Sequence, residues 1–190
     1  RAPKSQKSYA LIGGGSPLKK LTLEQGVALE KELAKLGRFK VDMAMRYWPP
    51  FARETLQKLA DQHISRIIAL TLYPHYSKAT TGSSLDDLRH AAVSFGDFFE
   101  IAEIAAWPDQ PDYIGCLADT IVAGMQQFEG GDVQLVYSAH SLPVQFIEEG
   151  DPYLDDMHKT IAAVEKITKI PGHLCFQSRS GPVEWLSPST

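Results

Sequence analysis

The sequence predicts an α/β fold, in which parallel strands form sheets that carry helices on both faces. Short apolar runs alternate along the chain with amphipathic segments of helical length, the order typical of β-α-β units. Two of the runs, 67–72 and 133–137, are almost continuously apolar, as in strands that are covered on both faces of a parallel sheet. A chain of 190 residues is long enough to bury a core and corresponds to one or two domains.

The first elements follow a glycine-rich stretch, Gly13–Gly15. We interpret it as a tight backbone turn, because it lacks the lysine of a phosphate-binding loop. Apolar residues then recur at helical spacing over residues 21–36. Thr22, with Gln25 three residues later, predicts a capping box near the start of this helix, and Gly37 predicts its end.

The other elements are predicted from the same two periodicities. Alternating or continuous apolar runs indicate strands, and apolar residues at helical spacing indicate amphipathic helices. In chain order they are a strand at 41–45, a helix at 51–61, a strand at 67–72, a helix at 84–95, a strand at 100–106, a helix at 111–128, a strand at 133–137, a helix at 153–168 and a strand at 173–177.

Composition excludes several classes of protein. The chain is 44% hydrophobic and 22% charged, as in ordinary soluble proteins, and its net charge of −4 argues against a nucleic-acid partner. Cys116 and Cys175 are too few for a disulfide scaffold or a cysteine-rich metal site, so we expect a reducing compartment. Neither a signal peptide nor a membrane-spanning apolar run is visible, and we expect a cytoplasmic location.

Aromatic and basic side chains follow the predicted strands at the point where each strand ends. Because ligands of open α/β sheets bind at the carboxyl ends of the strands, one edge of the sheet is expected to gather these groups. Such a site suits a flat, largely apolar ligand that carries negative groups and meets an imidazole. The residues are Arg46, Tyr47 and Trp48, then Tyr73 to Tyr76, then Trp107, then Ser138 to Ser141.

His140 lies between two serines at the end of a predicted strand. On the residues alone, both a loop hydrogen-bonding role and a catalytic role stay open for it. Ser138 and Ser141 do not make it part of a hydrolase triad, because the chain lacks a Gly-x-Ser-x-Gly elbow and near neighbours rarely point at one another. On the residues alone His75 is a weaker candidate, because Tyr73 to Tyr76 could simply pack, and Trp107 before Pro108 is more typical of a core residue than of a ligand platform. The sequence also contains no His-Glu-x-x-His or Cys-x-x-Cys zinc pattern.

Six segments of the chain carry a family resemblance. They are RAPKSQKSYALIGGGSPL, MRYWPPF, LYPHYSKATTGSS, SAHSLP, GDPY and QSRSGPVEWLSPST. In this order and at matching spacing they resemble the ferrochelatase family, and together they span nearly all of the 190 residues.

The resemblance implies a chelatase-type fold of two similar Rossmann-like halves, with a porphyrin in the cleft between them. On this basis residues 1–111 form the first half and residues 112–190 the start of the second. The family pattern places a further strand before Arg1 and a glutamate-bearing segment after Thr190, and the chain does not begin with Met. We therefore expect this chain to be the central piece of a longer enzyme.

The resemblance also implies an activity: a lyase-type metallochelatase that inserts ferrous iron into protoporphyrin IX, the last step of haem synthesis in most organisms that make it. Iron is then a substrate, and no resident cofactor is indicated. His140 matches the family's active-site histidine and either accepts a pyrrole proton or ligates the iron, since imidazole does both near neutral pH. The positions that match porphyrin-binding residues are Arg1, Tyr9, Ser16, Arg46 and Tyr47, with Tyr73 and Trp107 as further lining residues.

Two alternatives stay open. One is a related metallochelatase that takes another tetrapyrrole or another metal. The other is a non-catalytic porphyrin-binding fragment, because the partner glutamate is not in this chain. The family also includes peripheral membrane and mitochondrial members, and some carry an Fe–S cluster on a later tail that these residues do not include. Peripheral membrane association, a homodimer and, in a eukaryote, the mitochondrial matrix are therefore further expectations for the whole protein.

Overall fold

The computed structural model describes residues 6–7, 9–128 and 132–190, and it confirms an α/β fold with parallel strands. The chain divides into two compact units, which we describe separately. Unit 1 consists of Arg1–Ser65 and His90–Gly96, and unit 2 of Arg66–Arg89 and Asp97–Thr190. The division at residue 111 refers to the two halves of the family fold rather than to these units, and it stays a prediction.

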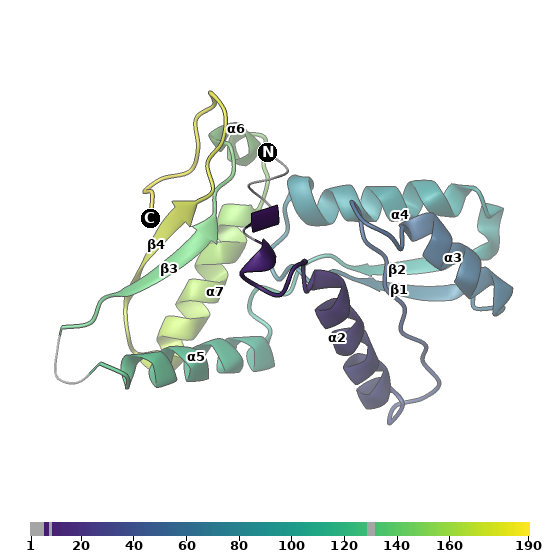
Figure 1. Ribbon diagram of the computed structural model, residues 1–190, viewed down its shortest axis with the longest axis horizontal. Coiled ribbons are helices and arrows are strands. Elements are labelled where there is room, and N and C mark those ends of the chain that lie inside the picture. Colours follow the sequence, from purple (N-terminus) through teal and green to yellow (C-terminus); the bar gives the residue numbers. More distant parts are fainter. Residues whose placement is uncertain (1–5, 8, 129–131) are drawn as a thin grey trace. The chain divides into compact units, whose positions relative to one another are not determined.

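The described part of unit 1 includes the helices α2 (Leu18–Leu33) and α3 (Ala52–Asp61), joined by an irregular connection (Figure 1). Helix α3 agrees with the helix predicted at 51–61. Its amphipathic pattern buries Leu56 and Leu59, and the Glu54 carboxylate accepts a hydrogen bond from the Phe51 amide at its start. This contact pairs the amide of the residue that precedes the first helical turn.

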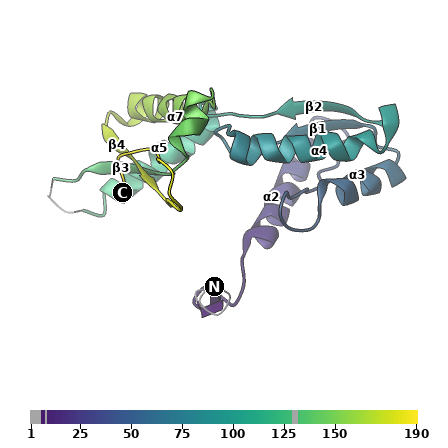
Figure 2. The ribbon, with the colours of Figure 1, turned by 90° about the horizontal axis from the view of Figure 1, so that it is seen from above.

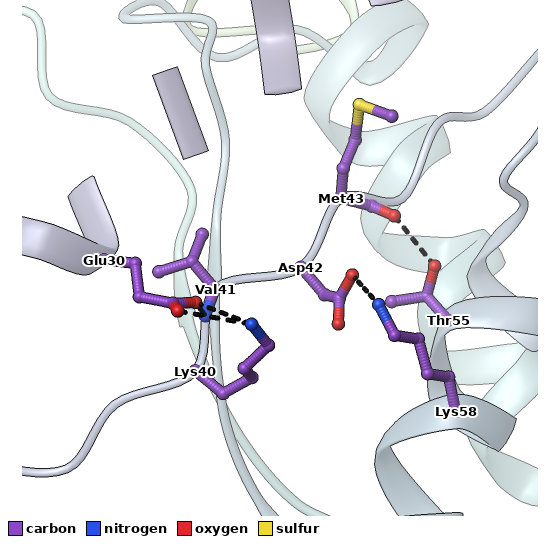
Figure 3. A network of polar contacts seen from close by, with 7 residues as sticks. All are labelled: Glu30, Lys40, Val41, Asp42, Met43, Thr55 and Lys58. Carbon is purple, nitrogen blue, oxygen red and sulfur yellow. Dashed lines mark hydrogen bonds and ion pairs between the residues drawn. The ribbon is translucent and has the colours of Figure 1, made fainter. Parts of the chain in front are cut away.

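The connection is held to both helices by hydrogen bonds, which Figure 3 shows. The Glu30 carboxylate of α2 accepts from the Val41 amide at 2.6 Å, and the Lys58 ammonium of α3 donates to Asp42 at 2.7 Å. The first contact, followed by that with Lys40, lowers the pKa of Glu30, so this carboxylate stays charged near neutral pH. The other contacts drawn are Lys40 with Glu30 and Thr55 with the Met43 carbonyl.

Two predictions for unit 1 are wrong. Helix α2 begins at Leu18, so Thr22 lies inside the helix and does not cap it. The residues ahead of Thr22 are good helix formers, and Pro17 has the backbone angle of a helix start, so the helix extends back to Leu18. Residues 41–45 form no strand with any of the described residues, because side chains of α2 and α3 bind polar groups of this segment instead.

The first part of unit 2 is a parallel ladder of two strands, with register from Arg66↔Glu100 to Leu70↔Ile104. Helix α4 runs alongside this ladder (Figure 2), and the Arg89 guanidinium donates to the Glu103 carboxylate at 2.8 Å. The π-helical turn before α4 was not predicted. In chain order the elements are β1 (Arg66–Leu70), η1 (Lys78–Gly82), α4 (Ser83–Val93), η2 (Gly96–Phe98) and β2 (Glu100–Ile104), of which the end of α4 from His90 and Gly96 fall in unit 1.

The prediction that the apolar strands are covered on both faces is wrong for the described residues. Along β1, half-buried Ile67 and Ala69 alternate with Ile68 and Leu70, which are 61% and 43% exposed. Strand β2 repeats this alternation, and β3 exposes Val136. A continuous apolar run shows that both faces of a strand are apolar, but not which face other elements cover. In the described part of the chain, each ladder contains only two strands.

The second part of unit 2 is another parallel ladder, between β3 (Leu135–His140) and β4 (Gly172–Gln177). Helices α5 (Pro111–Met125) and α7 (Tyr153–Thr168) pack side by side next to it (Figure 1). Both helices were predicted, as was β4. The core contains Ala139, Leu142, Phe176 and Leu186, with Tyr153, Leu154 and Met157 of α7 packed against it.

The C-terminal segment of the described chain returns to this ladder after β4. The Phe176 amide donates to the Pro188 carbonyl at 2.8 Å, and the Leu186 amide to the Leu142 carbonyl at 3.0 Å. A short helix, α6 (Val144–Glu148), follows Leu142. Among the helices of residues 6–7, 9–128 and 132–190, none has the length and apolar character that crossing a membrane requires.

Candidate functional site

His140, the predicted catalytic residue, is the last residue of β3, and its side chain is exposed. We predicted a strand that ends at Tyr137. It continues through His140 because β4 pairs with these positions as far as Gln177. The imidazole therefore belongs to the end of a hydrogen-bonded strand and not to a free loop.

The peptide that joins His140 to Ser141 is held from both sides. Its N–H, that of Ser141, donates to the Gln177 carbonyl of β4 at 2.8 Å, and its carbonyl, that of His140, accepts from the Tyr153 hydroxyl at 2.9 Å. The fully buried Ser141 hydroxyl also donates to the Leu186 carbonyl at 3.3 Å. The site thus combines an accessible imidazole with a fixed backbone, as a preorganised catalytic group requires.

Tyr153, the first residue of α7, connects this strand end to the loop after β1. Its ring meets the His75 ring edge-on, with centroids 6.2 Å apart and planes at 86°. Burial, and then the negative charge of Asp151, raise the pKa of Tyr153, so its hydroxyl keeps its proton near neutral pH. The hydroxyl is therefore a constant hydrogen-bond donor to the His140 carbonyl.

His75 lies in the same network and is hydrogen-bonded rather than free. Its Nε2 is 2.8 Å from the Thr160 hydroxyl oxygen, and that hydroxyl donates its one hydrogen to the Pro108 carbonyl at 2.5 Å. Thr160 must therefore accept from His75, which places the proton of the neutral ring on Nε2. Burial lowers the pKa of His75, with Asp156 opposing, so the ring is neutral near pH 7.

The buried carboxylate of Asp151, 4% exposed, ties the loop after β1 to the start of α7. Its Oδ2 accepts from the Ser77 hydroxyl at 3.0 Å and from the Lys78 amide at 2.7 Å, and its Oδ1 from the Tyr153 amide at 3.0 Å. Asp156 of α7 binds the same loop, because its carboxylate accepts a hydrogen bond from the Tyr76 amide at 3.1 Å. The loop is thereby fixed through charge-assisted hydrogen bonds.

Trp107 and Tyr73, predicted as lining residues, lie in the loops that follow β2 and β1, three residues beyond each strand. The Trp107 indole donates to the Thr71 carbonyl at 2.9 Å, and its ring meets Tyr113 edge-on at 5.0 Å. Trp107 is half-buried, which also fits a packing role, whereas Tyr73 is 54% exposed. Their contact with a porphyrin stays a prediction.

These contacts bring together the ends of three strands of unit 2. Thr160 of α7 meets the loops after β1 and β2, through His75 and Pro108, and Tyr153 of α7 meets the end of β3 at His140. We expected the ends to gather at the edge of one sheet. The strands instead form two separate ladders, and α7 connects their ends.

The remaining predicted residues belong to unit 1. Arg46 and Tyr47 are exposed and in contact, with the guanidinium carbon 5.2 Å from the ring centroid. Ser16 accepts a hydrogen bond from the Leu18 amide at 3.3 Å. Tyr9 is 43% exposed, and its carbonyl accepts from the Gly14 amide at 2.8 Å, within the predicted tight turn. Arg1 lies outside the described residues.

Sequence reasoning gave no role to Asp151, Tyr153 or Thr160, although Asp151 and Tyr153 lie in one of the segments that carry the resemblance. The signal that was available is an aspartate just ahead of a helix, a position where a carboxylate binds free amides. Within the described part of the chain, no group of three or more His, Cys, Asp or Glu side chains is arranged to hold a metal ion.

Comparison with known proteins gives the family. The sequence model named Ferrochelatase matches residues 1–190. Over the whole of this chain, identity is 53% to the ferrochelatase of Desulfotalea psychrophila and 48% to that of Geotalea uraniireducens, of which the chain covers 59% and 60%. Identity to the ferrochelatase of Synechocystis is 39%, with 51% of that protein covered. The chain thus spans about 60% of the length of the first two relatives. It belongs to the ferrochelatase family.

Proposed function

We propose that the whole protein inserts Fe²⁺ into protoporphyrin IX to form haem, and that this chain supplies the histidine end of its site. The observation that carries the proposal is the setting of His140, an exposed imidazole whose following peptide is hydrogen-bonded on both sides. Membership of the ferrochelatase family supports the choice of both substrates.

The reaction exchanges two pyrrole N–H protons for one Fe²⁺, so the site has to accept protons and replace the water around the iron. A flat porphyrin hides its nitrogen lone pairs, and a pocket that favours a distorted ring lowers the barrier. The imidazole of His140 either accepts a pyrrole proton or ligates the arriving iron. Both roles need it exposed to the macrocycle, which suits its exposure in unit 2.

We assign porphyrin contacts to the exposed aromatic and basic residues. Tyr73 of unit 2 presents a ring that is 54% exposed, and Tyr47 of unit 1 one that is 76% exposed. Arg46, in contact with Tyr47, and Arg1 are proposed to bind the propionates, because guanidinium groups pair well with carboxylates. Tyr9, Ser16 and Trp107 complete the proposed set.

An anaerobic titration tests the proposal. Protoporphyrin IX is added to the whole protein until its fluorescence change saturates, and Fe²⁺ is then added while the absorbance is followed. The haem spectrum should replace the porphyrin spectrum catalytically, over many turnovers. Saturable binding without metallation would instead favour the non-catalytic alternative. Faster insertion of Co²⁺, or faster reaction of coproporphyrin or sirohydrochlorin, would favour a different metallochelatase.

The proposed location is the cytoplasm, and it rests on cysteine usage, since Cys116 and Cys175 are both free thiols in the structure. Peripheral membrane association and homodimerisation are further proposals for the whole protein. Cell fractionation with and without a high-salt wash, followed by sedimentation analysis, decides among these states.

A further inference from the structure

We propose that Tyr153 is a positioning residue for His140, whose imidazole it directs through a hydrogen bond to the His140 backbone. The inference rests on the proposed function, because it concerns the same site. Tyr153 is thirteen residues away in the sequence and belongs to α7, whereas His140 ends β3. The contact between them therefore depends on the fold of unit 2.

The peptide that joins His140 to Ser141 is held at both of its polar groups. A trans peptide is planar, so the His140 carbonyl and the Ser141 N–H point in opposite directions. The N–H binds Gln177 of β4 at 2.8 Å, and the carbonyl binds the Tyr153 hydroxyl at 2.9 Å. With both ends of the peptide held, its rotation is blocked. That rotation is ψ of His140, which sets how the peptide lies relative to the side chain.

Tyr153 is itself held in place on three sides. Its amide donates to Asp151 at 3.0 Å, its ring meets His75 edge-on at 6.2 Å, and it packs against the core that contains Ala139 and Phe176. The hydroxyl is thus aimed by a rigid ring. Loss of the hydroxyl alone would free one end of the His140 peptide and leave this packing intact.

Tyr153→Phe in the whole protein tests the inference, because it removes the hydroxyl and keeps the ring. Tyr137→Phe is the matched control: Tyr137 lies on β3 as well, and its hydroxyl oxygen is buried without a hydrogen-bond partner in the described structure. The rate of iron insertion is divided by the concentration of sites that bind porphyrin. Misfolded protein is thereby left out of kcat. Melting temperatures are recorded for both variants.

We expect Tyr153→Phe to lower kcat about tenfold while the porphyrin KM stays within about twofold, because misplacement by a fraction of an ångström costs rate and not binding. Tyr137→Phe should keep the parent kcat. The inference would be overturned if Tyr153→Phe kept the parent kcat, if Tyr137→Phe lost as much in kcat, or if only the porphyrin KM changed in Tyr153→Phe. The proposed function would stand in each of these cases. If the parent protein inserted no iron, the proposed function would be wrong, and this inference with it.

Discussion

At the scale of single residues, the buried carboxylate of Asp151 holds the loop after β1 to the start of α7. It accepts hydrogen bonds from Ser77, Lys78 and Tyr153. In Asp151→Asn one acceptor oxygen becomes an NH₂ group that faces a donor. We expect the free energy of unfolding to fall by about 2–3 kcal/mol, the range for charged hydrogen bonds with a buried group left unpaired. Urea denaturation of the whole protein measures this loss.

Asp155→Asn is the matched control for that substitution. Asp155 lies in the first turn of α7, close to Asp151 at the same end of the helix, but it is exposed. Its removal should cost only the favourable interaction of a negative charge with the helix N-terminus, below about 1 kcal/mol. Equal losses in the two variants would show that Asp151 acts through helix charge alone and not by holding the loop.

His75 predicts a pH dependence of stability. Burial lowers its pKa in the folded protein, so the unfolded chain binds the proton at higher pH than the folded one. The contribution of His75 is therefore complete above its unfolded pKa of about 6.5 and is lost as the pH falls through and below that value. The free energy of unfolding should drop between pH 7 and pH 5 more steeply in the parent than in His75→Gln.

Urea denaturation at several pH values measures this slope, with His158→Gln as control. His158 is exposed on α7, so its replacement should leave the slope of the parent unchanged. Parallel stability curves for the parent and His75→Gln would mean that His75 does not have the buried, neutral ring described above.

At the scale of elements, the β3–β4 ladder is closely packed at its first pair. A Cβ placed on Gly172 would lie 2.5 Å from Cε2 of the Tyr137 ring and 3.0 Å from Leu135. Gly172→Ala should therefore push the strands apart and cost about 1–3 kcal/mol, the usual penalty for overpacking. Thermal unfolding of the variant measures the cost as a lowered melting temperature.

Gly115→Ala is expected to have the opposite sign. Gly115 lies inside α5, and among the described residues a Cβ there would meet nothing within 4 Å apart from the neighbouring backbone of its own helix. Alanine in the interior of a helix is favoured over glycine by roughly 0.5–1 kcal/mol, so the melting temperature should rise. A fall in Gly115→Ala, or no fall in Gly172→Ala, would contradict the packing described for unit 2.

Periodicity predicted elements well where packing follows the local pattern. Helix α7 begins at Tyr153 and ends at Thr168, as its apolar spacing indicates. The prediction failed where a contact distant in sequence decides the structure. Residues 41–45 alternate like a strand, but Glu30 and Thr55 bind their backbone. The turn Lys78–Gly82 likewise begins at an amide that Asp151 binds from 73 residues away.

The candidate site was predictable to a similar extent. His140 ends a strand, Tyr73 and Trp107 lie just past the ends of two others, and the α/β rule points to such positions without knowledge of the fold. The residues that hold these ends together could not be found this way. Tyr153 acts on a backbone carbonyl, and no residue pattern in the sequence reveals which carbonyl a tyrosine will meet.

At the scale of the whole molecule, unit 2 contains three predicted site residues, Tyr73, Trp107 and His140, and unit 1 contains Tyr9, Ser16, Arg46 and Tyr47. The chain covers 59% of its relative from Desulfotalea psychrophila, and its family gives the reaction that the whole protein is proposed to catalyse. We therefore propose that one exposed imidazole, fixed by the fold of unit 2, is required for metallation and dispensable for porphyrin binding.

The rate of iron insertion by His140→Ala in the whole protein tests this claim most directly, with porphyrin affinity measured in parallel. His158→Ala serves as the control for loss of an exposed histidine. We expect His140→Ala to lose at least about a hundredfold in rate, as for removal of a proton-transfer group, while its porphyrin affinity stays within about threefold of the parent. Insertion at the parent rate with unchanged porphyrin affinity would contradict the account.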